Sequence, residues 1–239
     1  GQLVAAAPAY RKLNSHGEFV FDHAWADAHE RCGLRYYPKL LCAVPYSPVV
    51  GPRLLLAADE PAQTRQALAR ALRDEAEARA WSGAHVNFAT PEDDQALADD
   101  GWLRREDVQF HWTNAPYASF DDFLGALNAK RRKEIRRERT RVAADGWQFE
   151  ARRGSELDDT QIARLHALYL GTFLDKGNYP ALTPAFFARL ARDAADPLLA
   201  LLGKRDGRIG AMALCLRSGD TLYGRYWGAD DPTPGLHFE

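Results

Sequence analysis

The feature that most constrains the fold is the last segment of the chain, which reads as two paired strands leading into a helix. Within Arg208–Arg217 the apolar residues recur at every second position, the period of a half-buried strand. Turn-forming residues follow at 218–220, and the aromatic run TLYGRYWG at 221–228 fits a second, antiparallel strand. A loop then leads to Pro234, where we expect a helix to begin because proline suits the first helical turn.

A strand that feeds the N-terminus of a helix is a favourable place for an anion. The first N–H groups of a helix have no partner within it, and the helix dipole puts partial positive charge at the same end. We therefore expect a substrate or cofactor to bind where the strand at 221–228 meets the helix that starts at Pro234. The pattern leaves one alternative open, namely a hairpin followed by an ordinary surface helix.

Composition narrows the class of protein. With 239 residues the chain can form one large domain or two small ones, and its 46% hydrophobic and 27% charged residues are typical of soluble globular proteins. Its three cysteines lack CxxC spacing, so we interpret them as small core residues in a reducing compartment and expect a cytoplasmic protein. No apolar run in this sequence is long enough to span a bilayer, and we expect no signal peptide at its start. The chain does not start with Met, and we expect both ends to be cut from a longer protein.

Strand and helix patterns alternate along the rest of the chain, which predicts a mixed α/β fold. We divide the chain into two halves, residues 1–115 and 116–239. The expected strands are 2–11, 36–46 (broken by prolines), 84–89, 106–113, 147–152 and 198–202, and the expected helices are 18–31, 61–80, 91–100, 119–144, 159–176 and a short one after Thr183.

The predicted helix at 119–144 is strongly basic. Its run KRRKEIRRERTR at 130–141 holds eight basic and two acidic residues, on a chain whose net charge is −2. Arg132, Arg136 and Arg139 fall on one flank of this helix. They could form a track for phosphate groups, such as those of RNA, or belong to a solvated helix laced with ion pairs.

The N-terminal half offers a second set of candidate binding residues. Glu18 and Asp22 are four residues apart, so in the predicted helix at 18–31 their carboxylates share a face beside His23. A metal site there has no further support, and we predict no metal. We assign the side chains near the proline-rich segment and on the strand at 106–113 to an acceptor groove, with framing of a loop as the alternative: Tyr37, Lys39, Arg53 and His111.

Three segments of the chain resemble the bacterial FemAB-like family of predicted N-acyltransferases, described as peptidoglycan biosynthesis/recognition proteins. They are FDDFLGALNAKRRKEIRRERTRVAADG at 120–146, the stretch from LLALLGKRDG to the end at 198–239, and SHGEFVFDHAWADAHERCGLRYYPKLLCAVPYSPVVGPRLL at 15–55. The family belongs to the GNAT-fold superfamily and often has two such domains. The resemblance therefore implies two GNAT-like halves, each incomplete at one end of the chain.

The activity that this resemblance implies is N-acyl transfer to an amine, such as that of a peptidoglycan precursor. The donor would be acyl-CoA or, as in FemAB enzymes proper, aminoacyl-tRNA. In GNAT enzymes the thioester lies between two splayed strands and the pyrophosphate rests on the next helix. Carried over to this chain, the cofactor-binding residues are Trp227, Gly228, Gly235 and Leu236, and the candidates for proton handling are Tyr226, His237 and Glu239.

One departure weakens the expectation of CoA binding. The usual glutamine- or arginine-x-x-glycine-x-glycine loop is replaced by GADDPTPG at 228–235, and its two aspartates would repel a pyrophosphate. The donor site also requires the strands to part near Tyr226 and the amides at Gly235 to be open. Two alternatives to the transferase remain, namely a non-catalytic module that recognises a cell-wall peptide and an RNA-binding protein that uses the basic helix.

Overall fold

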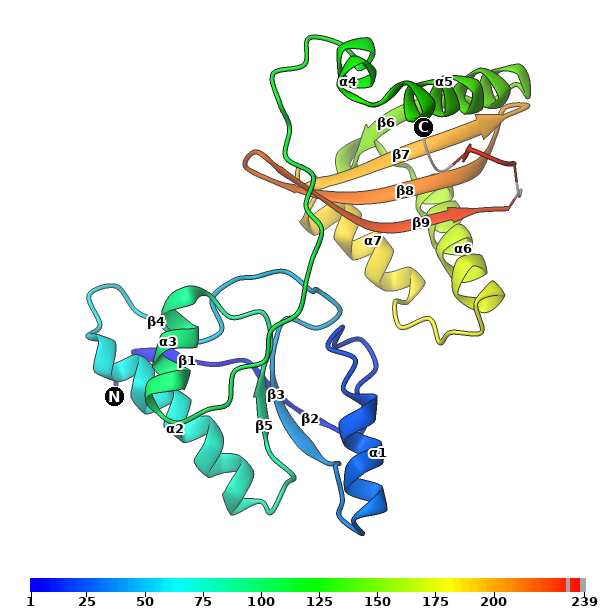
Figure 1. The fold of residues 1–239 in the computed structure, drawn as a ribbon. Coiled ribbons are helices and arrows are strands. Elements are labelled where there is room, and N and C mark those ends of the chain that lie inside the picture. Colours follow the sequence, from blue (N-terminus) through cyan, green and yellow to red (C-terminus); the bar gives the residue numbers. More distant parts are fainter. Residues whose placement is uncertain (231–232, 237–239) are drawn as a thin grey trace. The chain divides into compact units, whose positions relative to one another are not determined.

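The computed structural model describes residues 1–230 and 233–236, and these divide into two compact units, Gly1–Trp112 and Thr113–Glu239 (Figure 1). Each unit combines β-sheet and helices around a core of its own, so the predicted mixed α/β class is confirmed. None of the described helices combines the length and the apolar character needed to cross a membrane.

The first unit contains a small three-stranded sheet and a separate strand pair. β3 (Lys39–Cys42) lies in the middle of the sheet, antiparallel to β2 (Ala9–Lys12) and parallel to β5 (Ala84–Val86). β1 (Ala5–Ala6) pairs with β4 (Leu55–Leu56). The helices are α1 (His23–Arg31), α2 (Ala62–Ala78) and α3 (Pro91–Asp99).

The core of this unit forms where α2 and α3 meet the central strand. Every residue of β3 is buried, and Leu40 and Cys42 pack with Leu72 of α2 and Leu97 of α3. α3 begins as its sequence predicts, because the Thr90 side chain caps its first turn.

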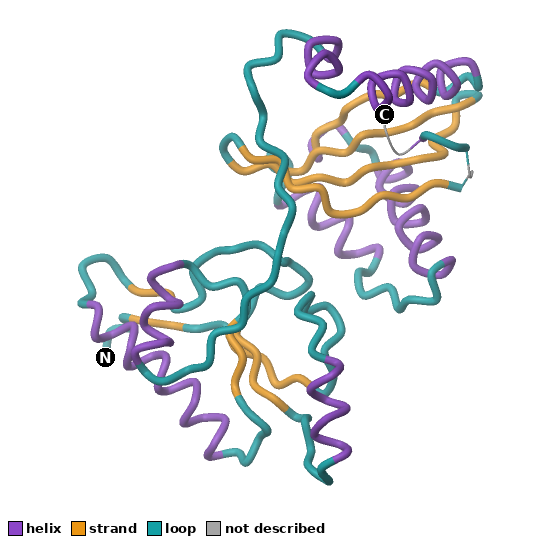
Figure 2. The backbone as a smooth tube through the Cα atoms, in the orientation of Figure 1, coloured by secondary structure: helices purple, strands orange, loops and turns teal. Residues whose placement is uncertain are grey.

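The second unit is a four-stranded antiparallel sheet with helices on both faces (Figures 1 and 2). The strands lie in the order β6 (Gln148–Arg153), β7 (Leu198–Arg205), β8 (Arg208–Ser218) and β9 (Thr221–Ala229). α6 (Asp159–Asp175) and α7 (Pro184–Asp193) cover one face, after the short 3-10 turn η1 (Gly154–Glu156), while α4 (Phe120–Ala126) and α5 (Ala129–Ala144) precede the sheet.

Neighbouring residues of β8 show how both faces are covered. Met212 packs with Leu168 and Tyr169 of α6, whereas Ala211 packs with Val142 of α5 and with Trp147. The predicted closing hairpin is present, since β8 and β9 pair from Ala211↔Ala229 to Ser218↔Thr221. Burial on both faces explains why the central strands lack a polar side.

Several predicted elements differ from the structure. The helix expected at 119–144 is two helices, because Leu127 is extended and Asn128 caps a new helix by accepting from Arg131 N at 2.9 Å. The helix expected from residue 18 starts only at His23, after a loop in which Phe19 and Phe21 have positive φ. Residues 106–113 form no strand, and their apolar side chains remain exposed.

Candidate functional site

The most unusual side chain of the first unit is Lys39, a lysine that is 0% exposed. It is the first residue of β3, so the strand carries it into the interior beneath α1. A buried ammonium must be paired and hydrogen-bonded to be tolerated. Lys39 Nζ donates to Glu18 Oε2 at 2.8 Å, to Asp22 Oδ2 at 2.6 Å and to Ser15 Oγ at 2.9 Å.

This arrangement explains the loop that precedes α1. Asp22 is the N-cap residue of α1, yet its side chain caps no helix N–H. Its Oδ2 instead accepts from Lys39 and, at 2.6 Å, from the hydroxyl of Tyr36. Glu18 is drawn inward in the same way and is 3% exposed. The spacing of the two carboxylates had predicted that they share one face of a helix. In the structure they instead meet around the ammonium of Lys39.

The pKa values of the two carboxylates are shifted in opposite directions although both groups bind one lysine. Burial raises the pKa of Glu18, and the hydrogen bond from Lys39 offsets this only in part. Burial also acts to raise the pKa of Asp22, but hydrogen bonds from Lys39, Tyr36 and Ser15 outweigh it and lower that pKa below its ordinary value. The Glu18 Oε1 and Asp22 Oδ1 atoms are buried, and neither accepts a hydrogen bond from any residue that the structure describes.

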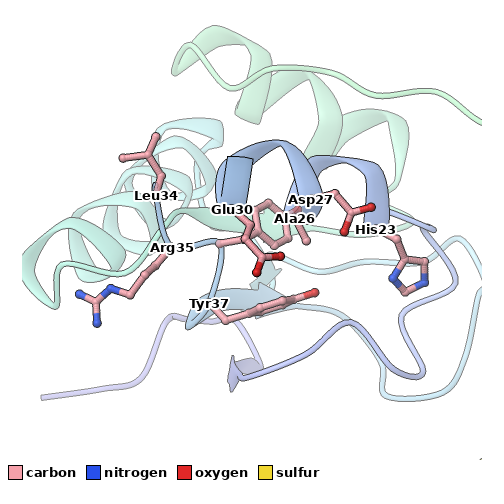
Figure 3. A pocket seen from close by; sticks show the side chains of 8 residues that line it. His23, Ala26, Asp27, Glu30, Leu34, Arg35 and Tyr37 are labelled. Carbon is pink, nitrogen blue, oxygen red and sulfur yellow. The ribbon is translucent and has the colours of Figure 1, made fainter. Parts of the chain in front are cut away.

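A pocket of about 440 Å³ lies beside this cluster, between α1 and the segment that leads into β3 (Figure 3). We call it the α1 pocket. Asp27 and Glu30 extend from α1 on one side, Tyr37 faces them, and His23 and Arg35 lie toward the two ends. Its lining residues are His23, Ala26, Asp27, Glu30, Leu34, Arg35, Tyr36 and Tyr37.

The aromatic wall of the α1 pocket is held in place by the buried cluster. The Tyr36 hydroxyl donates to Asp22, and the Tyr37 hydroxyl lies 2.8 Å from Ser15 Oγ. Lys39 Nζ also lies 5.2 Å from the centre of the Tyr36 ring and 5.7 Å from that of Tyr37, within cation–π range. The charges behind the wall therefore fix both rings at the pocket surface.

The pocket has the chemistry to bind a small zwitterionic group. The carboxylates of Asp27 and Glu30 suit an ammonium, and the guanidinium of Arg35 suits a carboxylate. The sequence contains a signal that we did not use, because His23, Asp27 and Glu30 recur at helical spacing along one face of α1. Arg35 and Ser15 carried no such signal.

Two residues assigned to an acceptor groove lie elsewhere. Arg53 is buried, and its guanidinium donates to the carbonyl oxygens of Asn87, Pro52 and Val49 at 2.8, 3.3 and 2.6 Å. It therefore holds the proline-rich loop together and cannot reach a ligand. His111 is exposed in the extended segment after α3, 3.3 Å from Gln109 Oε1, and does not line the α1 pocket.

The three arginines predicted to track phosphate are used within the second unit. Arg132 Nη1 donates to the carbonyl oxygens of Leu124, Gly125 and Leu127, which ends α4. Arg136 pairs with Asp121 at 2.8 Å, and the Arg139 guanidinium lies 4.1 Å from the centre of the Phe120 ring. This flank of α5 binds α4, which corrects the expectation of a phosphate track there.

The strands do not part near Tyr226. Leu214 pairs with Tyr226 and Ala213 with Trp227, with one irregularity between Leu214 and Cys215. The Tyr226 ring packs edge-on against Tyr169 at 4.8 Å between ring centres, so it is part of the core. Within residues 1–230 and 233–236, β8 and β9 therefore stay paired beside Tyr226, apart from a register shift that skips Arg225, and the predicted gap for a donor is not seen there.

The glycine after Trp227 is needed for packing. A Cβ on Gly228 would lie 2.5 Å from the carbonyl oxygen of Leu168, because the backbone of α6 passes directly over β9. Thr172 of α6 also donates to Trp227 O at 3.1 Å. These contacts give Gly228 a structural role, and its assignment to cofactor binding gains no support from the geometry.

The amides after β9 are not open to a ligand. Pro234 and Gly235 form a turn, in which Gly235 has φ 89° and lies against the Glu138 side chain. Leu236 is buried, and its N–H donates to Thr233 O at 3.3 Å. Pro234 and Gly235 therefore form a turn and Leu236 lies in a 3-10 turn, whereas the rest of the helix predicted from Pro234, with His237 and Glu239, lies outside the described residues.

The aspartates of the loop at 228–235 should repel an anion less than the sequence suggested. Asp230 forms an ion pair with Arg164 of α6, so one of the two aspartates of the loop is neutralised. Arg164 also donates to Ile209 O at 2.8 Å, which fixes its position. Among the described residues, no group of three or more His, Cys, Asp or Glu side chains is placed to hold a metal ion.

The comparisons with known proteins bear on the whole chain. The sequence profile of the FemAB-like family, described as peptidoglycan biosynthesis/recognition, matches residues 1–239. The chain belongs to the FemAB-like family. No curated protein matches it.

Two solved structures resemble this FemAB-like chain. The C-terminal DUF2156 domain of a protein described as a lysylphosphatidylglycerol synthetase, from Agrobacterium fabrum, is 16% identical with a TM-score of 0.50, over 82% of this chain and 56% of that one. A conserved protein of unknown function from Bacteroides thetaiotaomicron VPI-5482 is 14% identical with a TM-score of 0.48, over 85% of this chain and 64% of that one. The first likeness shows a shared fold, and this chain spans less than two thirds of either structure's length.

Proposed function

We propose that this protein binds the amine-bearing peptide of a peptidoglycan precursor in the α1 pocket of the first unit, and that the amine of this peptide accepts an acyl or aminoacyl group. The observation that carries the proposal is the lining of that pocket. Asp27 and Glu30 face an aromatic wall with Arg35 nearby, so one pocket offers partners for both an ammonium and a carboxylate. The family description, which covers peptidoglycan biosynthesis and recognition, supports a peptide of this kind.

The reaction would join the acceptor nitrogen to a donor carbonyl carbon. The ammonium first loses a proton, the C–N bond forms, and the C–S bond of an acyl-CoA or the C–O ester bond of an aminoacyl-tRNA breaks. We place the reaction in the cytoplasm, where both donors occur. The fold shared with a domain of a protein described as a lysylphosphatidylglycerol synthetase supports a transferase architecture, without naming the donor.

The donor would have to approach another side of β9 than the one we first expected. β9 is paired with β8 along its length and has no second partner strand among residues 1–230 and 233–236. An edge strand presents unpaired N–H and C=O groups, to which an amide-containing donor can hydrogen-bond. We propose this outer edge of β9 as the donor side.

Binding of the acceptor is tested with a pair of synthetic peptides. One carries a free side-chain amine and a free carboxylate, and the other is identical except that the amine is acetylated. We expect the free amine to bind at least about tenfold more tightly, because the acetylated form cannot pair with Asp27 and Glu30. The double variant Asp27→Asn, Glu30→Gln should bind both peptides equally, and equal binding by the unmodified protein would contradict the proposal.

A second candidate is recognition of the same peptide without transfer. The paired strands at Tyr226 and the occupied amide of Leu236 favour it, because they close the donor site that the sequence predicted. Turnover separates the two. Release of free thiol from acetyl-CoA, or loss of the ester of aminoacyl-tRNA, that depends on the free-amine peptide supports transfer. Tight binding with neither signal supports recognition alone.

A further inference from the structure

A second cavity lies in the second unit and plays no part in the proposed function. Its volume is about 430 Å³, and it is lined by Arg137, Glu138 and Arg141 of α5 together with Pro234 from the turn after β9. Two separate segments of the chain therefore enclose it, a helix and the turn that packs on that helix.

The two arginines are available to a ligand. Arg137 and Arg141 are four residues apart, so their side chains leave the same face of α5, and both are exposed. Within residues 1–230 and 233–236, no ion pair or hydrogen bond engages either guanidinium, unlike that of Arg136, which pairs with Asp121. Two forked guanidiniums at one cavity suit the oxygens of a phosphate group.

Glu138 adds an acceptor to the same cavity. Its Oε2 atom is buried and has no hydrogen-bond partner within the described part of the chain. Gly235 packs closely against the Cβ of Glu138, since a Cβ added at Gly235 would lie only 2.9 Å from it. A buried carboxylate oxygen without a donor is costly, so a ligand N–H or O–H at this position would be stabilising.

Two lysines strengthen the positive field along the approach. Lys130 and Lys133 precede Arg137 by two turns and one turn of α5, and both are exposed. Unlike the two arginines, they do not line the cavity. Their expected role is therefore long-range attraction of an anion, which is screened by salt, and not contact with it.

We propose that this cavity binds a phosphate group carried next to an amine or hydroxyl. Arg137 and Arg141 bind the phosphate oxygens, and Glu138 Oε2 accepts a hydrogen bond from the neighbouring donor. The site lies within the second unit and does not depend on the peptide site of the first.

Calorimetric titration of the full chain tests the site with three probes, namely inorganic phosphate, O-phosphoethanolamine and ethanolamine. We expect O-phosphoethanolamine to bind most tightly, phosphate more weakly and ethanolamine not measurably. The double variant Arg137→Gln, Arg141→Gln should weaken both phosphate ligands by about tenfold or more. Glu138→Gln should remove the preference for O-phosphoethanolamine over phosphate while leaving phosphate bound.

The matched control is Lys130→Gln, Lys133→Gln, which removes the same charge from the same face of α5. It should leave both affinities within about twofold at physiological salt. An equal loss of affinity in the lysine and arginine variants would show that the phosphate ligands respond to the overall positive charge of α5. That result would contradict a specific site at Arg137 and Arg141. Binding of neither phosphate probe would overturn it as well.

Vesicles distinguish the source of the phosphate. They contain phosphatidylcholine and phosphatidylethanolamine in equal parts, with pure phosphatidylcholine vesicles as the reference. Binding of soluble O-phosphoethanolamine without vesicle binding assigns the site to a soluble phosphorylated compound. Vesicle binding that requires phosphatidylethanolamine and is lost in Glu138→Gln assigns it to a lipid headgroup, and either result supports the cavity as a phosphate site.

Discussion

Lys39 Nζ lies 2.6 Å from Asp22 Oδ2, and both side chains are excluded from solvent. The pair joins the first residue of β3 to the N-terminus of α1, so it sets where that helix stands over the sheet. Through Tyr36, which donates to the same carboxylate oxygen, it also sets one wall of the α1 pocket.

Replacing Lys39 should destabilise the protein strongly. Lys39→Met leaves Glu18 and Asp22 as buried carboxylates without a cation, and loss of one partner from a buried ion pair costs about 3–5 kcal/mol. The free energy of unfolding, measured in urea, gives the effect. Lys12→Met is the control, because Lys12 is partly exposed and lies 3.9 Å from Glu18 Oε1, and it should cost less than about 1 kcal/mol. Similar losses in the two variants would refute a special role for Lys39.

Stability should decrease as the pH falls from about 6.5 to 4, because of His85. Burial, followed by the positive charge of Lys39, lowers the pKa of His85 to about 4 from an ordinary value of 6.5. Between these two pKa values the unfolded chain binds a proton at His85 that the folded chain does not. The free energy of unfolding therefore has its full value above pH 6.5 and decreases as the pH falls toward 4. Its upper bound is about 3 kcal/mol.

Unfolding curves at several pH values test the role of His85. His85→Gln should flatten the pH dependence between 6.5 and 4, since glutamine does not titrate. The depressed pKa of Asp22 acts in a lower window, around and below its ordinary value of 3.8, and should be unaffected by this variant. An unchanged slope in His85→Gln would show that another group titrates.

Gly228→Ala should destabilise the second unit even though alanine is small. The new Cβ would lie 2.5 Å from the Leu168 carbonyl oxygen, so β9 and α6 would have to separate, at a cost of about 1–3 kcal/mol. Gly224→Ala on the same strand is the matched control, because a Cβ there meets nothing within 4 Å. Thermal unfolding of both variants should show a loss for Gly228→Ala alone. A comparable loss in the control would show that the effect is not one of space.

Arg132→Ala should loosen α4. It removes the donor that satisfies the carbonyl oxygens of Leu124, Gly125 and Leu127, and we expect a loss of about 1 kcal/mol in the local stability of α4. Hydrogen exchange of the α4 amides should accelerate accordingly. Arg137→Ala removes the same charge from the exposed side of α5 and should leave that exchange unchanged. Equal acceleration would indicate a general electrostatic effect.

Local signals in the sequence predicted several elements well. The alternation and turn residues of 208–228 predicted the β8–β9 hairpin, and the run at 198–202 predicted a central strand. The helix expected to begin at residue 119 does begin there, and the Ser119 Oγ atom caps it by accepting from Asp122 N at 3.1 Å. Such signals depend on residues within a few positions of one another.

Contacts between distant residues were not predictable in this way. Glu18 and Lys39 are 21 positions apart. The local pattern predicted a helix through Glu18, whereas in the structure its carboxylate binds the buried lysine and the helix begins only at His23. The break at Leu127 is a different case, because its signal is local: Asn128 caps α5 by accepting from Arg131 N, and we read one continuous helix through it. The family resemblance placed Tyr226 at a gap between two strands, whereas its ring packs against Tyr169 at the core of the second unit.

The sequence by itself determined the mixed α/β class, the closing hairpin, the basic character of α5 and, through long motifs, membership of the FemAB-like family. Only the tertiary structure decided which charged side chains bind partners inside the protein and which line a cavity. Internal hydrogen bonds engage Lys39, Arg53 and Arg132. The side chains that line cavities include Asp27, Glu30 and Arg137. The physical reason is that the cost of burying a charge depends on partners brought together by folding, which no local pattern records.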